Sequence, residues 1–410
     1  MIFFKVEKHG VFDVYNIFGI RFFHINKVRF NKYINIIDGF SSDICLLKRS
    51  MLYYKSNYKN NISNIYDKCD AFRKDLDSLS LNNDFVIDYI NGFNVFNINK
   101  YPINCDYSVI KNGLLVYDYR GDDSYYNPGG RVNLGDYIQS IATRQFLPKV
   151  DKFISRDEIS TYNDEPIKLI MNSWWWCCSG INDIPEQITP LFISYHLDNP
   201  ENISPSIISY LKKYEPIGCR DMFTVRALTS YGIIAYFSAC MTLTLGNKYK
   251  KNNSDESKIL VCDYDVTENN CLNDFLKKHL KDAYNLDEFE TCTNVCLSDT
   301  TTHNDRFYLA NELLERYSSA KLVITSRLHC ALPCLSIGIP VILMISKYDA
   351  KRYDGLIDFI NYVTTNEQGN ILSVIKRQNV TGEVVNDEKY TKYKYFLSNA
   401  ASKFMNDDFS

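Results

Sequence analysis

The sequence lacks the long hydrophobic runs and the excess of positive charge that define several large classes of protein. No stretch approaches about 20 consecutive apolar residues, so we expect no transmembrane helix. Lys and Arg number 46 against 49 Asp and Glu, and the resulting net charge of −3 provides no global cationic field for nucleic acid. The glycine-rich residues 129–135 fit neither GxGxxG nor GxxxxGK[ST], so neither a dinucleotide site nor a P-loop is supported.

An export signal and a metal-binding cysteine pattern are also missing. Charge arrives at Lys5 with no apolar stretch after it, so we expect no secretory signal. The 13 cysteines then predict reduced thiols and a cytoplasmic protein. The pairs Cys330/Cys334 and Cys292/Cys296 have no second Cys or His pair at zinc spacing, so we interpret them as small buried residues and expect no metal.

The first hundred residues differ in character from the rest. Residues 1–34 interleave basic and aromatic side chains, which is typical of a hairpin or arm that packs on the main body, or of peripheral contact with the inner face of the plasma membrane. Residues 41–92 are polar and poor in glycine and proline, which predicts a helical connector. We treat residues 1–100 as an N-terminal extension.

Beyond residue 100 the chain predicts an α/β fold. With 45% hydrophobic residues and a length of 410, it is long enough for two or three domains. Short apolar runs alternate with helical patterns, as in βαβ units with a parallel sheet. We expect two Rossmann-like domains facing across a cleft, at residues 101–246 and 258–385, with a linker at 247–257 and a closing helix at 386–410. The predicted strands are 113–119, 167–172, 191–195, 215–218, 233–237, 258–262, 322–325 and 341–344, and the predicted helices are 136–146, 221–230, 271–280, 305–317, 329–337 and 386–406.

The clearest unit is residues 321–344, a strand, a turn at Ser326 and a helix ended by Gly338. Arg327 and His329 therefore lie at the carboxyl end of a strand and the start of a helix, where open α/β sheets bind ligands. The helix N-terminus and the guanidinium favour a phosphate or carboxylate, and the imidazole can supply a proton. The alternative is an arginine that satisfies helix carbonyls and a histidine of the core.

A second corner of this kind is Arg220-Asp221, where a strand gives way to a helix that Asp221 can cap. If Arg220 faces Arg327 across the cleft, the two arginines and His329 suit a small anion with several charges. The alternative is a surface arginine paired with a helix carboxylate.

Further polar residues end predicted strands or open predicted helices. Asn133 and Asp136 belong to a glycine-rich turn that opens a helix, and they either line the cleft or make only a tight turn. Asn172 and Ser173 precede three tryptophans, which suits a sugar ring or an ordinary core edge. His196 follows the predicted strand 191–195, where it can orient or deprotonate an acceptor hydroxyl or be a capped core histidine.

At these residues the chain resembles the polysaccharide pyruvyl transferase family over residues 115–365. The most specific segments are VITSRLHCALPCLSIGIPVI and PIGCRDMFTVRALTSYGI, supported by YFSACMTLTL, LIMNSWWW and NLGDYIQSIA. Ser238 and Thr242 of YFSACMTLTL, with Ser326, are added as candidate substrate-binding residues. Asn172-Ser173-Trp174 stands where many relatives have Asn-Gly-Trp, a departure that concerns the acceptor rather than the fold.

The resemblance implies a two-domain architecture similar to GT-B glycosyltransferases and a defined reaction. The enolpyruvyl unit of phosphoenolpyruvate is attached to two hydroxyls of one sugar, and phosphate leaves. The acceptor belongs to a cell-surface polysaccharide, such as a capsule or exopolysaccharide, or to a precursor that can be lipid-linked. Arg327 and Arg220 would hold the donor, His329 would protonate its methylene carbon, and no cofactor is implied.

Two other functions fit the same residues. A GT-B-like glycosyltransferase can hold the diphosphate of a nucleotide sugar with the same arginines, and a non-catalytic glycan-binding relative can keep the fold. Stabilisation by phosphoenolpyruvate would indicate the pyruvyl transferase, and stabilisation by a nucleotide would indicate the glycosyltransferase. A binding protein has no need of both Arg327 and His329.

Overall fold

The computed structural model describes most of the chain beyond residue 110 and three short segments before it. The described residues are 5–9, 12–17, 20–25, 110–118, 130–176, 184–198, 203–252, 258–264, 270–297, 301–346, 350–365, 371–375, 378–379 and 381–406. The chain divides into two compact units, Met1–Asn97 and Ile98–Ser410. The helical connector predicted at 41–92 lies outside the described residues.

The first unit contains a three-stranded antiparallel sheet. Strands β1 (Lys5–His9), β2 (Phe12–Ile17) and β3 (Ile20–Ile25) pair in chain order. The segments are rich in Phe, Ile, Val and Tyr, which favour strands. The hairpin expected in residues 1–34 is therefore present and is extended by a third strand.

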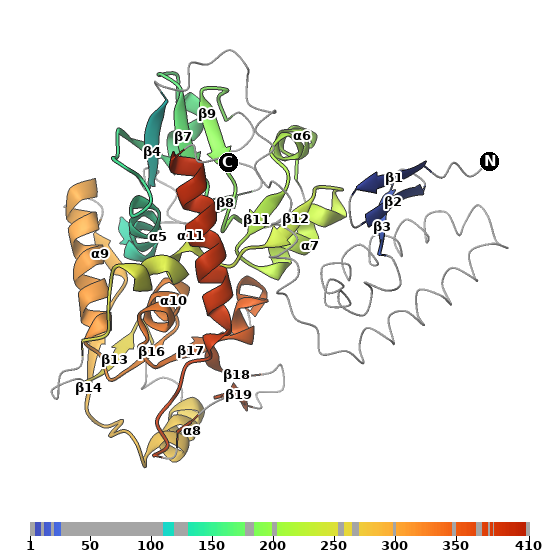
Figure 1. The fold of residues 1–410 in the computed structure, drawn as a ribbon. Helices are drawn as coiled ribbons and strands as arrows, with labels where there is room; N and C mark the ends of the chain where they lie inside the picture. Colours follow the sequence, from blue (N-terminus) through green and yellow to red (C-terminus); the bar gives the residue numbers. More distant parts are fainter. Residues whose placement is uncertain are drawn as a thin grey trace. The chain divides into compact units, whose positions relative to one another are not determined.

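The second unit begins with a parallel sheet, which with the elements up to residue 252 forms the first α/β half (Figure 1). Its strands pair in the order β6-β4-β7-β9, namely β6 (Lys152–Ser155), β4 (Lys111–Val116), β7 (Ile167–Ile170) and β9 (Ile188–Leu191). Two smaller parallel pairs follow, β8 (Trp174–Trp176) with β10 (His196–Asp198) and β11 (Ile217–Cys219) with β12 (Ala235–Phe237). The helical elements of this half are α5 (Leu134–Arg144), η4 (Arg156–Thr161), α6 (Pro205–Lys213), α7 (Met222–Ser230) and η6 (Met241–Asn247), and β5 (Arg131–Asn133) precedes α5.

The single strand predicted at 191–195 is wrong. Strand β9 ends at Leu191, and β10 begins at His196 on a different sheet. Between them Ser194 has a φ of 57°, in the left-handed region that interrupts a strand. His196 is therefore the first residue of a new strand and does not lie at the carboxyl end of the predicted one.

The second α/β half, residues 258–406, contains a six-stranded sheet. Its order is β14-β13-β16-β17-β18-β19, and only β19 is antiparallel to its neighbour. The strands are β13 (Ile259–Cys262), β14 (Phe289–Cys292), β16 (Leu322–Thr325), β17 (Val341–Ile345), β18 (Asn361–Thr365) and β19 (Ile371–Val374), connected in part by α8 (Asn270–Leu280), α9 (His303–Ser318), α10 (Leu328–Ile337), η7 (Ala350–Tyr353) and η8 (Leu356–Asp358). Strand β13 comes first in the chain but lies between β14 and β16 in the sheet. The connections that follow therefore lead to opposite sides of β13, and the order of strands reverses between β13 and β16. In doubly wound folds ligands bind at the carboxyl ends of such strands.

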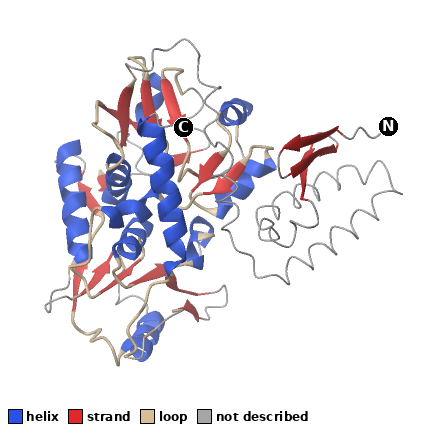
Figure 2. Cartoon of the chain, in the orientation of Figure 1, coloured by secondary structure: helices blue, strands red, loops and turns tan. Residues whose placement is uncertain are grey.

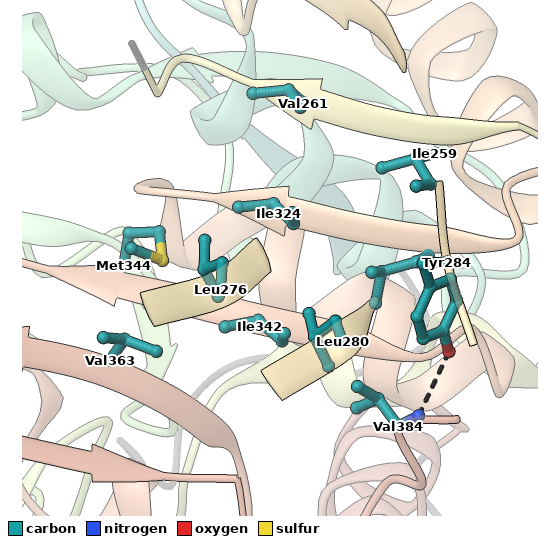
Figure 3. Packing of buried hydrophobic residues seen from close by; sticks show 11 residues of the cluster. Ile259, Val261, Leu276, Leu280, Tyr284, Ile324, Ile342, Met344, Val363 and Val384 are labelled. Carbon is teal, nitrogen blue, oxygen red and sulfur yellow. Dashed lines mark hydrogen bonds between the residues drawn. The ribbon is translucent and has the colours of Figure 1, made fainter. Parts of the chain in front are cut away.

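Alternate strand residues of this half point to one hydrophobic core (Figure 3). Leu276 and Leu280 stand one turn apart on α8 and belong to one cluster with Ile259, Ile324 and Ile342 of three neighbouring strands. The main-chain N–H of Val384 donates to Tyr284 Oη at 3.1 Å, so the polar end of this buried tyrosine is satisfied. The alternation of strands and helices is confirmed (Figure 2).

Three elements, β15 (Val295–Leu297), η6 and α11 (Thr391–Asn406), make contacts between the two α/β halves. Strand β15 pairs with β5 of the first half, and Leu134 N donates to Asn294 O at 2.6 Å. In η6, Gly246 approaches α10 so closely that a Cβ would lie 1.9 Å from Ser336 O. The last helix, α11, returns to the first half (Figure 1). There Phe396 packs edge-on against Tyr236.

Several boundaries differ from those predicted. Asn247, expected in the linker, ends η6, and Tyr249 is buried with its hydroxyl on Asn311; residues 253–257 are not described. The closing helix starts at Thr391 because Asp387 first caps a short 3-10 turn, η9 (Glu388–Tyr390). Among the described residues, no helix is both long and apolar enough to cross a membrane.

The described cysteines are free thiols. Cys330 and Cys334 are buried, as predicted. Cys292 and Cys296 are only half-buried, because the strands β14 and β15 that carry them lie at sheet edges.

Candidate functional site

Two helix N-termini from different halves meet at His329. His329 lies in the first turn of α10, and Gly135 lies in the first turn of α5. A Cβ on Gly135 would be 3.1 Å from His329 Cβ and 3.4 Å from Nδ1, so glycine permits this approach. The positive ends of two helix dipoles therefore lie beside one buried imidazole, a setting that favours an anion.

A second histidine is held by an aspartate at the start of α7. His196 Nδ1 lies 2.5 Å from Asp221 Oδ2, and both side chains are completely buried. The other carboxylate oxygen, Oδ1, accepts from Thr224 N and Thr224 Oγ1, each at 2.9 Å. Asp221 thus caps α7, as predicted, and also orients His196.

Arg220 directly follows β11 and is almost completely buried. Its main-chain N–H donates to Tyr195 O at 2.8 Å, and its Nε lies 3.4 Å from Asp221 Oδ2. Within the described part of the chain, Arg220 Nη2 has no hydrogen-bond partner, nor have His196 Nε2 and His329 Nε2. Unpaired buried polar atoms cost free energy, so these three are candidates for binding a polar ligand.

The electrostatics of these groups indicate the charge of that ligand. Burial, followed by the charges of Arg220, Arg352 and His196, lowers the pKa of His329 well below its ordinary 6.5. Burial and Arg220 also lower the pKa of His196, although Asp221 opposes them. Burial raises the pKa of Asp221, but His196, Arg220 and the Thr224 N–H outweigh it and keep the carboxylate ionised. The site therefore holds neutral histidines beside two guanidinium groups, Arg220 and Arg352, and one carboxylate, Asp221, and this balance of charge favours an anion.

Arg327 lies where the order of strands reverses. It follows β16, and its Nε lies 2.9 Å from Oδ2 of Asp263, which follows the neighbouring β13. Ser326 Oγ donates to Asp263 O, so the two strand ends are joined twice. We expected Arg327 to face Arg220. In the structure the immediate partner of Arg327 is Asp263, and the Arg327 side chain is 43% exposed.

Part of this chain matches a known family. Residues 192–348 match the family model of polysaccharide pyruvyl transferase. The resemblance read from the sequence is confirmed over this segment, which includes His196, Arg220, Arg327 and His329. A comparison with curated proteins finds none that matches the chain. The match indicates a transferase of polysaccharide biosynthesis.

Four predicted acceptor residues precede the pyruvyl transferase segment and lie in the first α/β half. Asn133 caps α5 by accepting from Gly135 N at 3.0 Å, and Asp136 accepts from Gln139 in the next turn. Asn172 is buried and donates to Gln139 O, so it supports the same helix. Ser173 O accepts from His196 N at 3.1 Å, which places the Asn172-Ser173 segment beside β10.

Three predicted hydroxyl residues inside the pyruvyl transferase segment have internal partners. Ser238 Oγ accepts from Ser194 N at 2.9 Å and donates to Cys219 O at 3.1 Å, so it supports the strand end that carries Arg220. Thr242 Oγ1 contacts Cys240 Sγ at 3.2 Å. Ser326, as above, joins β16 to β13. These contacts give all three a structural role.

Two charged residues of the site, Asp263 and Arg352, were not predicted from the sequence. Asp263 directly follows a predicted strand, a position that could have indicated it. Arg352 lies in η7, beyond the pyruvyl transferase segment, and no pattern indicated it. Its neighbours hold it near both halves, because Tyr353 Oη donates to Ser326 O at 3.3 Å and Met222 N donates to Asp354 O at 3.0 Å.

Across the described ranges, no group of three or more His, Cys, Asp or Glu side chains is arranged to hold a metal ion.

Proposed function

We propose that this protein transfers the enolpyruvyl group of phosphoenolpyruvate to two hydroxyls of a sugar in a cell-surface polysaccharide or its precursor. The observation that carries the proposal is that two buried polar atoms of this site, Arg220 Nη2 and His329 Nε2, have no hydrogen-bond partner among the described residues. Phosphoenolpyruvate offers a phosphate and a carboxylate for the cationic groups and a methylene carbon for the proton. The family match over the same residues supports this assignment.

The reaction needs one proton to reach carbon. The methylene carbon becomes a methyl group when it is protonated, and the neighbouring carbon becomes an electrophile that the first sugar oxygen attacks. The bond to the phosphate oxygen then breaks, and the second sugar oxygen completes the ketal. Of the two hydroxyl protons released, one replaces the proton on the acid and the other leaves with phosphate.

His329 is proposed as the acid despite its lowered pKa. Burial and the charges of Arg220 and Arg352 hold it neutral before the donor binds. A bound phosphate and carboxylate offset these charges, so the pKa of His329 rises in the complex and the ring takes up a proton. The donor would thus bring the acid into its working state.

The rest of the arrangement is proposed in keeping with this reaction. The two α/β halves would face one another as in GT-B enzymes, with the donor held by Arg220, Arg327 and His329. Asn133, Asp136, Asn172 and Ser173 would serve the acceptor side. The reaction would take place in the cytoplasm without a metal or other cofactor, with peripheral membrane contact through residues 1–34 when the acceptor is lipid-linked.

Thermal-shift titration with phosphoenolpyruvate tests the proposal. At about 100 times its dissociation constant, a ligand stabilises the native state by about 2.7 kcal/mol, which is a readable shift. We expect this shift in the wild type, its loss in Arg220→Gln and Arg327→Ala, and its retention in Arg316→Gln, an exposed arginine on α9. A shift with a nucleotide sugar but none with phosphoenolpyruvate would replace the proposal with a glycosyltransferase.

A further inference from the structure

We infer that His196 is the base that accepts the acceptor hydroxyl proton, through Nε2, and that Asp221 is the positioning residue that keeps Nε2 free for this task. The inference rests on the proposed function, because it assigns a base to one of the two hydroxyl deprotonations which that reaction requires. His329 supplies a proton to carbon, and a separate group must remove one from oxygen.

The hydrogen bonds around Asp221 determine which nitrogen of His196 carries the proton. An ionised carboxylate only accepts hydrogen bonds, and Asp221 Oδ2 lies 2.5 Å from His196 Nδ1. The Nδ1 atom must therefore carry the hydrogen, which leaves a lone pair on Nε2. That Nε2 is buried and has no partner within the described residues.

The same carboxylate stabilises His196 after it has accepted a proton. Asp221 Oδ1 is satisfied by Thr224 N and Thr224 Oγ1, so the carboxylate cannot rotate away without losing the cap of α7. An imidazolium at His196 then lies against a fixed negative charge. The other charged or titratable groups acting on His196 and His329 are Arg220 and Arg352, and both favour the neutral ring before the reaction.

The strand pairing puts His196 beside the segment that is proposed to serve the acceptor. It pairs with Trp174 across β10 and β8, and its N–H donates to Ser173 O at 3.1 Å. The adjoining residues Asn172 and Ser173 are the predicted acceptor contacts, whereas Arg220 on the other side belongs to the donor group. In the proposed step, the hydroxyl proton passes to Nε2 while the oxygen bonds to the electrophilic carbon, and the proton later leaves with phosphate.

The tautomer of His196 is measured by NMR on the full-length protein labelled with ¹⁵N-histidine. The chain has six histidines, and the His196 signals are those lost in His196→Gln. We expect hydrogen on Nδ1 and none on Nε2 in the wild type, and the reverse in Asp221→Asn, whose amide donates to Nδ1. Asp387→Asn, a second buried helix-capping aspartate, is the matched control and should leave these signals unchanged. A hydrogen on Nε2 in the wild type would overturn the inference.

Phosphate release from phosphoenolpyruvate separates failure of this inference from failure of the proposed function. The acceptors are methyl glycosides of common hexoses and, as a further acceptor, water. We expect Asp221→Asn and His196→Gln to bind phosphoenolpyruvate within about tenfold of the wild type but to release phosphate at least about 100-fold more slowly. Release at the wild-type rate in both variants would remove His196 as the base. Absence of binding and release in the wild type would instead reject the proposed function, and the tautomer would then describe a structural pair.

Discussion

Gly135 lies directly against the ring of His329, although the two residues come from different α/β halves of the chain. A Cβ at position 135 would be 3.1 Å from His329 Cβ and 3.0 Å from Asn133 Oδ1, which caps the same helix. Because Gly135 has no Cβ, His329, the proposed acid, can occupy its position against α5.

Gly135→Ala should therefore reduce activity more than stability. Alanine gains up to about 1 kcal/mol of helix propensity, which offsets the cost of a displacement of a few tenths of an ångström. We expect urea unfolding to change by less than about 1 kcal/mol and phosphate release from phosphoenolpyruvate to fall at least about tenfold. Unchanged release would show that His329 need not occupy its observed position.

Binding of phosphoenolpyruvate should take up a proton and tighten as the pH falls. Burial, Arg220 and Arg352 lower the pKa of His329 in the free protein, and the bound anion raises it, so the complex binds more protons. Calorimetry in two buffers of different ionisation enthalpy measures this uptake. His329→Gln retains the titration of the ligand itself and should lose the protein's share; equal uptake in both proteins would contradict the prediction.

Acid should destabilise the free protein through the same histidine. The pKa of His329 is lowered in the folded state, so below the unfolded value of about 6.5 the unfolded chain binds the additional proton. Stability then falls with pH by up to about 1.4 kcal/mol per unit for this group. We expect a shallower loss between pH 6.5 and 5 in His329→Gln than in the wild type, as measured by urea unfolding at each pH. Parallel curves would exclude the lowered pKa.

Gly246→Ala should destabilise the fold at the junction of the two α/β halves. The new Cβ would lie 1.9 Å from the main-chain oxygen of Ser336, which belongs to α10 and cannot rotate away. Overpacking of this kind costs about 3 kcal/mol. Chemical denaturation should show that loss, whereas Asn247→Ala at the neighbouring exposed position should cost less than about 1 kcal/mol. Similar values for both variants would show that η6 and α10 can separate freely.

Residues 1–34 provide a separate test, because their basic and aromatic composition predicts peripheral membrane contact. Deletion of these residues should abolish flotation of the protein with anionic liposomes at low salt. Neutral liposomes are the control and should bind neither form. Flotation that is unchanged by the deletion would exclude membrane contact through this segment.

Local patterns were sufficient for the elements that carry most of the proposed donor site. The strand predicted at Leu322–Thr325 is β16, and the helix predicted at 329–337 is α10 with one added residue. Gly338 ends that helix in the left-handed conformation, at φ 93°. Continuous apolar runs and cap residues are properties of neighbouring residues, so they can be recognised without knowledge of the rest of the fold.

The same reasoning failed where a conformation depends on distant contacts. The apolar run 191–195 has strand composition, but it connects the end of one strand, β9, to the start of another, β10, on a different sheet. The turn at Ser194 between them is held by a hydrogen bond from its main-chain N–H to Ser238 Oγ. The predicted linker includes residues that pack on other elements, because Tyr249 reaches Asn311 on α9. Neither contact has a signal in the local sequence.

The sequence by itself determined the α/β alternation, the family resemblance, and the positions of Arg220, Arg327 and His329 at the junctions of strands and helices. Only the tertiary structure decided which of these side chains meet. The order of strands places Asp263 beside Arg327, and the start of a separate strand, β10, places His196 against Asp221. The lack of a Cβ on Gly135 lets His329 lie against α5. The physical reason is that hydrophobic periodicity and capping act over a few residues, whereas strand order and close packing of helices depend on contacts between segments far apart in the chain.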